Sequence, residues 1–221
     1  MDVYTTVVKF FQEGGLFMYP IAMVLGIGLA IAIERWVYLS MTTAKNKALW
    51  NAVTPYLKSG NLSGAVQVTS KSGAAIGQIM TYGLNRVRSA RRREDVEQAM
   101  EESLMEVMPR LEKRTHYLAT FANIATLLGL LGTIVGLISA FTAVATANPA
   151  EKADLLSASI SVAMNTTAFG LIVAIPLLLV HTLLQTKTTE IIDSLEMASV
   201  KFLNAITERA SDAKAPAGAK G

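Results

Sequence analysis

The stretch from Tyr117 to Ala150 constrains the fold most, because no Asp, Glu, Lys or Arg interrupts it. An α-helix rises about 1.5 Å per residue, so roughly 20 apolar residues cross the hydrocarbon core of a bilayer. Two further stretches, residues 16–33 and 155–186, also lack these charged side chains. The sequence therefore predicts an all-α membrane protein with three transmembrane helices.

The composition agrees with a membrane protein and argues against several kinds of site. Charged residues make up 17% of the chain, below the roughly 25% that is typical of soluble domains. The chain has no cysteine and two histidines, which leaves little for thiol chemistry, a metal centre or acid–base catalysis. Aromatic residues do not interleave the basic cluster, as they would in a nucleic-acid-binding surface. We expect no enzyme activity, cofactor, metal or nucleic-acid partner.

Charge and apolar runs divide the chain into segments. They are an outer N-terminal segment (1–15), a first transmembrane helix (16–40), a polar helical region (41–116), a second transmembrane helix (117–147), a short outer loop (148–156), a third transmembrane helix (157–186), a polar helix (187–210) and a disordered tail (211–221). Lys and Arg are concentrated in region 41–116. The positive-inside rule therefore places that region and the C-terminus in the cytoplasm, with the N-terminus outside.

The first apolar run has a second interpretation as a signal peptide, because Ala30–Ile31–Ala32 imitates a cleavage site. The run is too long for that, and Lys9 is the only basic side chain before it, so a retained helix is favoured. The residues before it, with Val3, Val7 and Phe10, suit a short amphipathic helix.

Helix signals continue through the polar regions. Lys45–Leu57 has a helical pattern, Asn61 or Ser63 can cap a short helix to about Thr69, and another helix follows to about Arg88. Two apolar stripes at helical spacing come next: Val96, Met100, Leu104, Val107 and Leu111, and then Ile191, Leu195, Ala198, Phe202 and Ile206. We expect one helix from about Arg91 to about Ala147, kinked at Pro109, so that the second and third transmembrane helices extend far into the cytoplasm.

Small residues mark where helices can approach closely. Gly129, Gly132 and Gly136 recur at steps of three and four, and Gly170 and Pro176 lie in the third apolar run. Such a face favours close helix packing in lipid. The pattern does not tell whether the partner helix belongs to the same subunit or to another.

Polar side chains inside the apolar runs are candidates for an ion pathway. Thr126 and Thr133 share a line with Asn123, and Asn165, Thr166 and Thr167 are adjacent in the third run. Lipid offers such groups no partners, so a protein-lined or water-lined surface is indicated. The alternative is that each Thr hydroxyl bonds back to a carbonyl of its own helix.

Two segments resemble the MotA/TolQ/ExbB proton channel family. LLGLLGTIVGLISAF, at residues 127–141, resembles the second span of ExbB and TolQ, and SISVAMNTTAFGLIVAIPLLL, at 159–179, resembles the third. The three-span plan fits ExbB and TolQ rather than the four-span MotA branch. The resemblance implies a pentamer in the bacterial inner membrane, with a periplasmic N-terminus. It implies that the pentamer surrounds a dimer of ExbD/TolR-like single-span partners and drives a TonB- or TolA-like protein. It also implies a titrating partner Asp, with the family's pore-lining threonines at Thr133 and Thr167.

One position departs from the family pattern. Aligned on GLxxAIP, a Glu that ExbB and TolQ usually carry is Val162 here. Neither long apolar run then holds a carboxylate. Either the partner Asp carries the proton alone, helped by Asn165 and the hydroxyls, or the chain belongs to a branch other than TonB or Tol energisation.

The main hypothesis is therefore an ion-channel or stator subunit that couples the proton motive force to work on the cell envelope. The alternatives are a non-conducting scaffold that clamps a partner helix, and a gliding or flagellar-like motility stator. A permease is disfavoured, because inverted repeats and intramembrane charges are missing. A neighbouring gene for a single-span protein with a membrane Asp would favour the channel. The choice of H⁺ or Na⁺ stays open.

Overall fold

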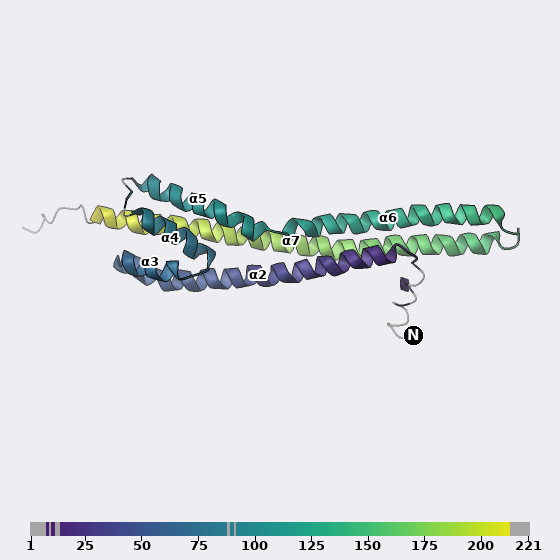
Figure 1. Cartoon of the computed structure of the whole chain (residues 1–221), viewed down its shortest axis with the longest axis horizontal. Helices are drawn as coiled ribbons and strands as arrows, with labels where there is room; N and C mark the ends of the chain where they lie inside the picture. Colours follow the sequence, from purple (N-terminus) through teal and green to yellow (C-terminus); the bar gives the residue numbers. More distant parts are fainter. Residues whose placement is uncertain (1–7, 9, 12–13, 88, 91, 213–221) are drawn as a thin grey trace, which may run out of the picture. The chain divides into compact units, whose positions relative to one another are not determined.

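The computed structural model describes residues 8, 10–11, 14–87, 89–90 and 92–212, and the elements that it assigns there are all helices. In chain order (Figure 1) they are α2 Met18–Ser59, α3 Leu62–Ser70, α4 Ala75–Val87, α5 Arg93–Glu112, α6 Thr115–Thr146 and α7 Lys152–Asp212. The predicted all-α class is confirmed for this part of the chain.

The chain divides into two compact units. Unit 1 comprises Met1–Arg35 and Arg114–Leu184, and unit 2 comprises Trp36–Lys113 and Gln185–Gly221. Helix α6 belongs to unit 1 and helices α3, α4 and α5 to unit 2, whereas α2 and α7 contribute residues to both.

Three helical stretches of the described chain are long and apolar enough to cross a membrane, and they include most of each of the three predicted runs. Only 22–28% of the residues in their most apolar windows are buried within the chain. Lipid or other chains must cover the rest, because apolar patches of this size are unusual on soluble monomers.

The core of unit 1 combines small and large side chains. Small buried residues of α6 and α7 include Ala122, Ala125, Ala140, Ala163 and Ala174, and Leu118, Leu177 and Leu184 are larger ones. Small residues let helix backbones approach closely in lipid, where packing replaces the hydrophobic drive. Helix α2 joins this core where Leu177 of α7 fills the space over Gly28.

Unit 2 is packed by the two predicted apolar stripes. Val96, Met100, Leu104, Val107 and Leu111 of α5 are all buried. Ile191, Leu195, Ala198 and Phe202 of α7 are buried too, and Ile206 is half-buried. The stripes are confirmed because side chains three or four positions apart share one helix face.

Two asparagines cap the short helices of unit 2. Asn61 Oδ1 accepts a hydrogen bond from Gly64 N at 2.9 Å, which makes Asn61, rather than Ser63, the N-cap of α3. Asn46 of α2, 5% exposed, accepts from Ile76 N at 3.2 Å in the first turn of α4. The first cap follows from a local pattern, whereas the second needs the packed structure.

The expected single helix from Arg91 to Ala147 is wrong at one place. Helix α5 continues through Pro109, whose carbonyl accepts from Lys113 N at 3.1 Å, and ends at Glu112. Arg114 then has a left-handed φ of 67° before α6 begins, which costs a non-glycine residue about 1–2 kcal/mol. Its guanidinium pairs with Glu34 at 2.8 Å within unit 1. Nothing local in the sequence marks an arginine for this conformation.

Other boundaries shift by a few residues. The predicted first span and the Lys45–Leu57 helix form one helix, α2, and α7 begins at Lys152, inside the predicted loop 148–156. Helix α7 runs through Pro176 to Asp212, so two residues of the predicted tail 211–221 are helical. The rest of that tail, and most of the predicted N-terminal amphipathic helix, lie outside the described residues.

Candidate functional site

Helices α6 and α7 of unit 1 are in backbone contact at the glycine stripe. A Cβ at Gly129 would lie 3.2 Å from the Thr166 carbonyl oxygen, and one at Gly170 would lie 2.7 Å from the Ala125 carbonyl oxygen. A Cβ at Gly136 would meet the Cβ of Ala163 at 2.9 Å. The stripe therefore packs against a helix of the same subunit. Pro176, by contrast, is exposed.

The close approach brings Thr133 and Thr167 together. Their hydroxyls are hydrogen-bonded to each other across the α6–α7 contact. Thr167 Oγ1 also donates to the Gly129 carbonyl at 2.9 Å, and Thr133 Oγ1 lies 3.2 Å from the same oxygen. Both side chains are half-buried. The structure thus unites two residues that are 34 positions apart in the sequence.

This hydroxyl pair has more acceptors than hydrogens. Each Thr hydroxyl carries one hydrogen and two lone pairs, while the pair contacts the carbonyls of Gly129 and, at 3.4 Å from Thr133, Ala163. One hydroxyl donates to the other, and the second donates to a carbonyl. Rotation about the two C–O bonds reverses which hydroxyl donates to the other and which donates to the carbonyl. The pair can therefore accept a hydrogen bond from a neutral acid or turn a hydrogen toward an anion without any fixed charge.

The other three predicted pathway residues are placed differently. Thr126 is exposed and bonds back to the Ala122 carbonyl at 3.1 Å, as the alternative interpretation expected. Thr166 is 2% exposed and lies 2.6 Å from the Gly14 carbonyl and 2.9 Å from the Val162 carbonyl of its own helix, so the alternative interpretation also holds for it in part. Asn165 lies two positions before Thr167, about 200° away around the helix, so it does not share the face of the hydroxyl pair.

A groove of about 260 Å³ in unit 1 was not predicted from the sequence. Gly132, Gly136, Val162 and Thr166 line it together with residues 14–17. A Cβ at Gly15, whose φ is 74°, would lie 3.1 Å from Val162 Cγ1. Val162, the position at which the resemblance implies a Glu, thus faces an N-terminal turn. The Gly14–Gly15 dipeptide was the available sequence signal for this turn.

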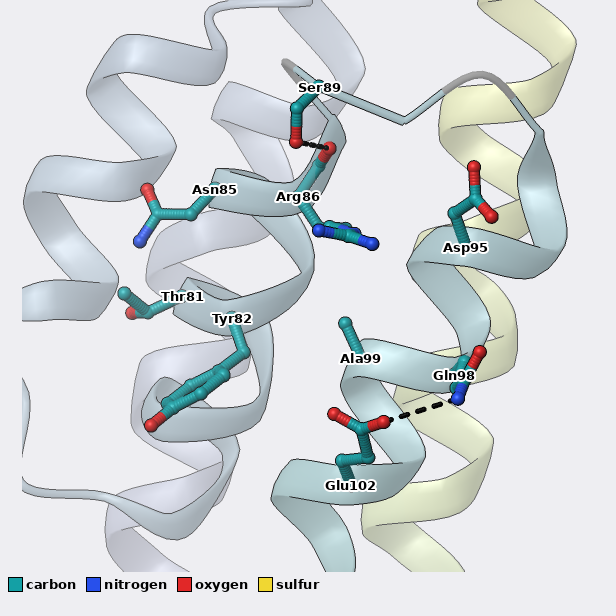
Figure 2. A pocket seen from close by; sticks show the side chains of 9 residues that line it. All are labelled: Thr81, Tyr82, Asn85, Arg86, Ser89, Asp95, Gln98, Ala99 and Glu102. Atoms are coloured by element: carbon teal, nitrogen blue, oxygen red, sulfur yellow. Dashed lines mark hydrogen bonds between the residues drawn. The ribbon is translucent and has the colours of Figure 1, made fainter.

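A larger hollow of about 540 Å³ lies between α4 and α5 in unit 2. Arg86 extends from α4 toward α5, where Gln98 donates to Glu102 at 3.3 Å (Figure 2). The charged side chains that line this hollow are of both signs, and they are exposed or half-buried. These features suit a solvated crevice between helices, and nothing there indicates an ion pathway.

The comparisons with known proteins decide the family. The sequence model described as the MotA/TolQ/ExbB proton channel family matches residues 71–197, more than half of the chain. The chain belongs to this family. The match includes all of α6 and α7 as far as residue 197, and therefore both residues of the hydroxyl pair. The described residues include three candidate spans, so the chain is a multi-pass membrane protein of a channel and transport family.

Relatives of ExbB type support the same assignment. The chain is 28% identical to a biopolymer transport protein ExbB homolog of Methanothermobacter thermautotrophicus, over 89% of this chain and 69% of that protein. It is 26% identical to an ExbB-like biopolymer transport protein of Synechocystis, over 76% of this chain and 80% of the relative. Over a shorter stretch, the chain is 47% identical to a biopolymer transport protein of ExbB type from Vibrio cholerae. This stretch covers 24% of this chain and 23% of the relative.

Proposed function

We propose that this chain is the channel-forming subunit of an ion-driven machine that performs biopolymer transport or related work at the cell envelope. Family membership and the names of the ExbB-type relatives support this function. The observation that carries it is the hydroxyl pair of Thr133 and Thr167, an uncharged relay inside two apolar helices. A scaffold that only clamps a partner needs no such relay.

The proposal requires a carboxylate from another chain. The apolar runs of α6 and α7 contain no Asp or Glu, and Val162 supplies none. An Asp on a partner helix, buried in lipid, would have its charged form destabilised and its pKa raised, so that it could bind and release a proton. We place that partner, an ExbD/TolR-like dimer of single-span chains, inside a ring of copies of this chain, with five copies as the resemblance implies. A TonB- or TolA-like protein would receive the work.

The proposal is tested by ion flux through the purified chain in liposomes, with the single-span partner present. A channel passes ions down an imposed gradient, whereas a scaffold holds the partner and passes none. The same reconstitution, with H⁺ or Na⁺ as the imposed gradient, identifies the ion.

We also propose that the N-terminus is periplasmic and the C-terminus cytoplasmic, with the polar segments of unit 2 on the cytoplasmic side of the inner membrane. In unit 2, Lys187 Nζ lies 4.3 Å from the Trp36 ring centroid and donates to Ser40 Oγ at 2.6 Å. Trp and Lys are typical of membrane interfaces. This contact supports a membrane edge near the predicted ends of the first and third spans.

The orientation predicts the labelling of introduced cysteines in this cysteine-free chain. Ser89 and Ala150 are both exposed in turns, so only the membrane should shield either position. In intact cells an impermeant thiol reagent should label Ala150→Cys and leave Ser89→Cys unlabelled. After permeabilisation both should react. Labelling of Ser89→Cys alone in intact cells would reverse the proposed topology.

A further inference from the structure

Unit 2 carries two grooves of opposite charge on either side of α7. The basic groove, about 330 Å³, is bordered by Lys47, Trp50, Met197 and Lys201, and none of the described residues that line it is acidic. The acidic groove, about 310 Å³, is bordered by Glu97, Glu101, Glu196 and Val200, and its lining within the described part of the chain includes no basic residue. Both grooves are formed by residues of unit 2 alone, which belong to α2, α4 and α7 for the basic groove and to α5 and α7 for the acidic one.

The two grooves use opposite faces of α7. Residues 194, 197, 198 and 201 line the basic groove, and residues 196, 199, 200 and 203 line the acidic one. At 100° per residue, the mean directions of these two sets are roughly 160° apart, and their mean heights along the helix differ by about 3 Å. The grooves are therefore back to back at nearly the same level.

Each groove also exposes apolar side chains. Met197 is 55% exposed on the basic side and Val200 is 47% exposed on the acidic side. Trp50 is half-buried beside Lys47. A surface that combines an apolar centre with charges of one sign at its edge fits a partner with an apolar centre and the opposite charge.

A second copy of this chain has the required surface. Copies in one membrane share one orientation, so a given residue lies at the same depth in every copy. In a ring around an axis perpendicular to the membrane, one face of each copy meets a different face of the next. The basic groove of one copy then faces the acidic groove of its neighbour at matching depth. A two-fold contact would instead bring like charges together, which is costly.

We propose that the basic and acidic grooves of unit 2 form a head-to-tail interface between neighbouring copies. Lys47 and Lys201 of one copy then face Glu97, Glu101 and Glu196 of the next, with Met197 and Trp50 against the apolar border at Val200. The proposal rests on the multi-copy assembly proposed above, and it specifies which surfaces meet.

Charge-reversal variants of the full-length chain, studied in lipid nanodiscs or mild detergent, test the interface. The Lys47→Glu/Lys201→Glu chain and the Glu101→Lys/Glu196→Lys chain should each lose assembly, by at least about tenfold in the equilibrium constant, because repulsion replaces attraction. The chain with all four substitutions should assemble again, since its two grooves are once more opposite in charge. Native mass spectrometry measures the distribution of oligomers.

The rescue separates this interface from a general folding defect, because the fourfold variant contains every substitution of the two failing ones. Lys58→Glu and Glu151→Lys, which lie outside both grooves, serve as matched charge controls and should assemble normally. Assembly of both reversal variants as in the unmodified chain would overturn the interface. So would normal assembly accompanied by loss of a co-purified single-span protein, which would assign the grooves to that partner.

Ion flux distinguishes this failure from failure of the proposed function. If the unmodified chain conducts ions but its assembly ignores the charge reversals, only the interface is wrong. If the unmodified chain assembles as described but never conducts with its partner, the channel function is wrong and the interface stands.

Discussion

Thr133→Val and Thr167→Val chains are expected to fold and assemble normally and to pass ions at least about tenfold more slowly than the unmodified chain. A hydrogen bond to a charged group contributes about 1.5–3 kcal/mol, and each 1.36 kcal/mol in a barrier changes the rate tenfold. The fold should survive because Thr167 still donates to the Gly129 carbonyl at 2.9 Å when Thr133 is replaced. Conversely, Thr133 lies 3.2 Å from that carbonyl when Thr167 is replaced. Flux in liposomes with the partner present measures the effect.

Matched variants separate the hydroxyl from the shape of the side chain. Thr133→Ser keeps the hydroxyl and should retain flux. Thr142→Val removes an exposed hydroxyl that bonds to its own helix at the Ile138 carbonyl, 2.8 Å away, and should behave like the unmodified chain. Full flux in the Thr133→Val/Thr167→Val double variant would exclude this pathway and favour the scaffold.

Gly170→Ala is expected to destabilise the α6–α7 pair by about 1–3 kcal/mol, the usual cost of overpacking. The added Cβ would lie 2.7 Å from the Ala125 carbonyl oxygen and 3.1 Å from Gly129 Cα. These are backbone atoms, so the two helices must separate to admit the methyl group. Separation would also pull Thr133 away from Thr167, and ion flux should fall together with stability. Thermal unfolding of the purified chain in detergent measures the stability.

Gly26→Ala is the matched control for this substitution. Gly26 lies in the apolar part of α2 and is exposed, and the described residues place no neighbouring heavy atom within 4 Å of the position that a Cβ would take. The change should leave stability unchanged or raise it by up to about 1 kcal/mol, because Ala favours the helix interior more than Gly does. If Gly170→Ala is as stable as Gly26→Ala, the α6–α7 contact is looser than the structure describes.

The elements of this fold follow from local patterns, whereas the hydroxyl pair follows from packing. The apolar runs, the stripe from Val96 to Leu111 and the cap at Asn61 are encoded within a few turns of helix. Thr133 and Thr167 were each identified as candidates, but the sequence alone does not show that their hydroxyls are hydrogen-bonded to each other. The glycine stripe indicated a close helix partner, and only the structure shows that this partner is α7 of the same chain.

The structure differs from the sequence-based expectations at two places, and each difference has a physical cause. Adjacency suggested that Asn165 and Thr167 act together, yet the helical period places them on nearly opposite faces. That difference was predictable from the period. The left-handed turn at Arg114 was not, because its partner Glu34 lies 80 residues earlier in the sequence. The contact between Thr166 and Gly14 spans 152 residues and is equally inaccessible to local reasoning.

Proton flux through the complex of this chain with a single-span partner tests the central claim most directly. The complex is reconstituted in liposomes with the partner's membrane Asp intact, or changed to Asn. The account predicts flux down an imposed gradient with Asp, and loss of that flux with Asn although the complex stays assembled. If an intact complex passes neither H⁺ nor Na⁺ with Asp in place, the chain is not a channel subunit.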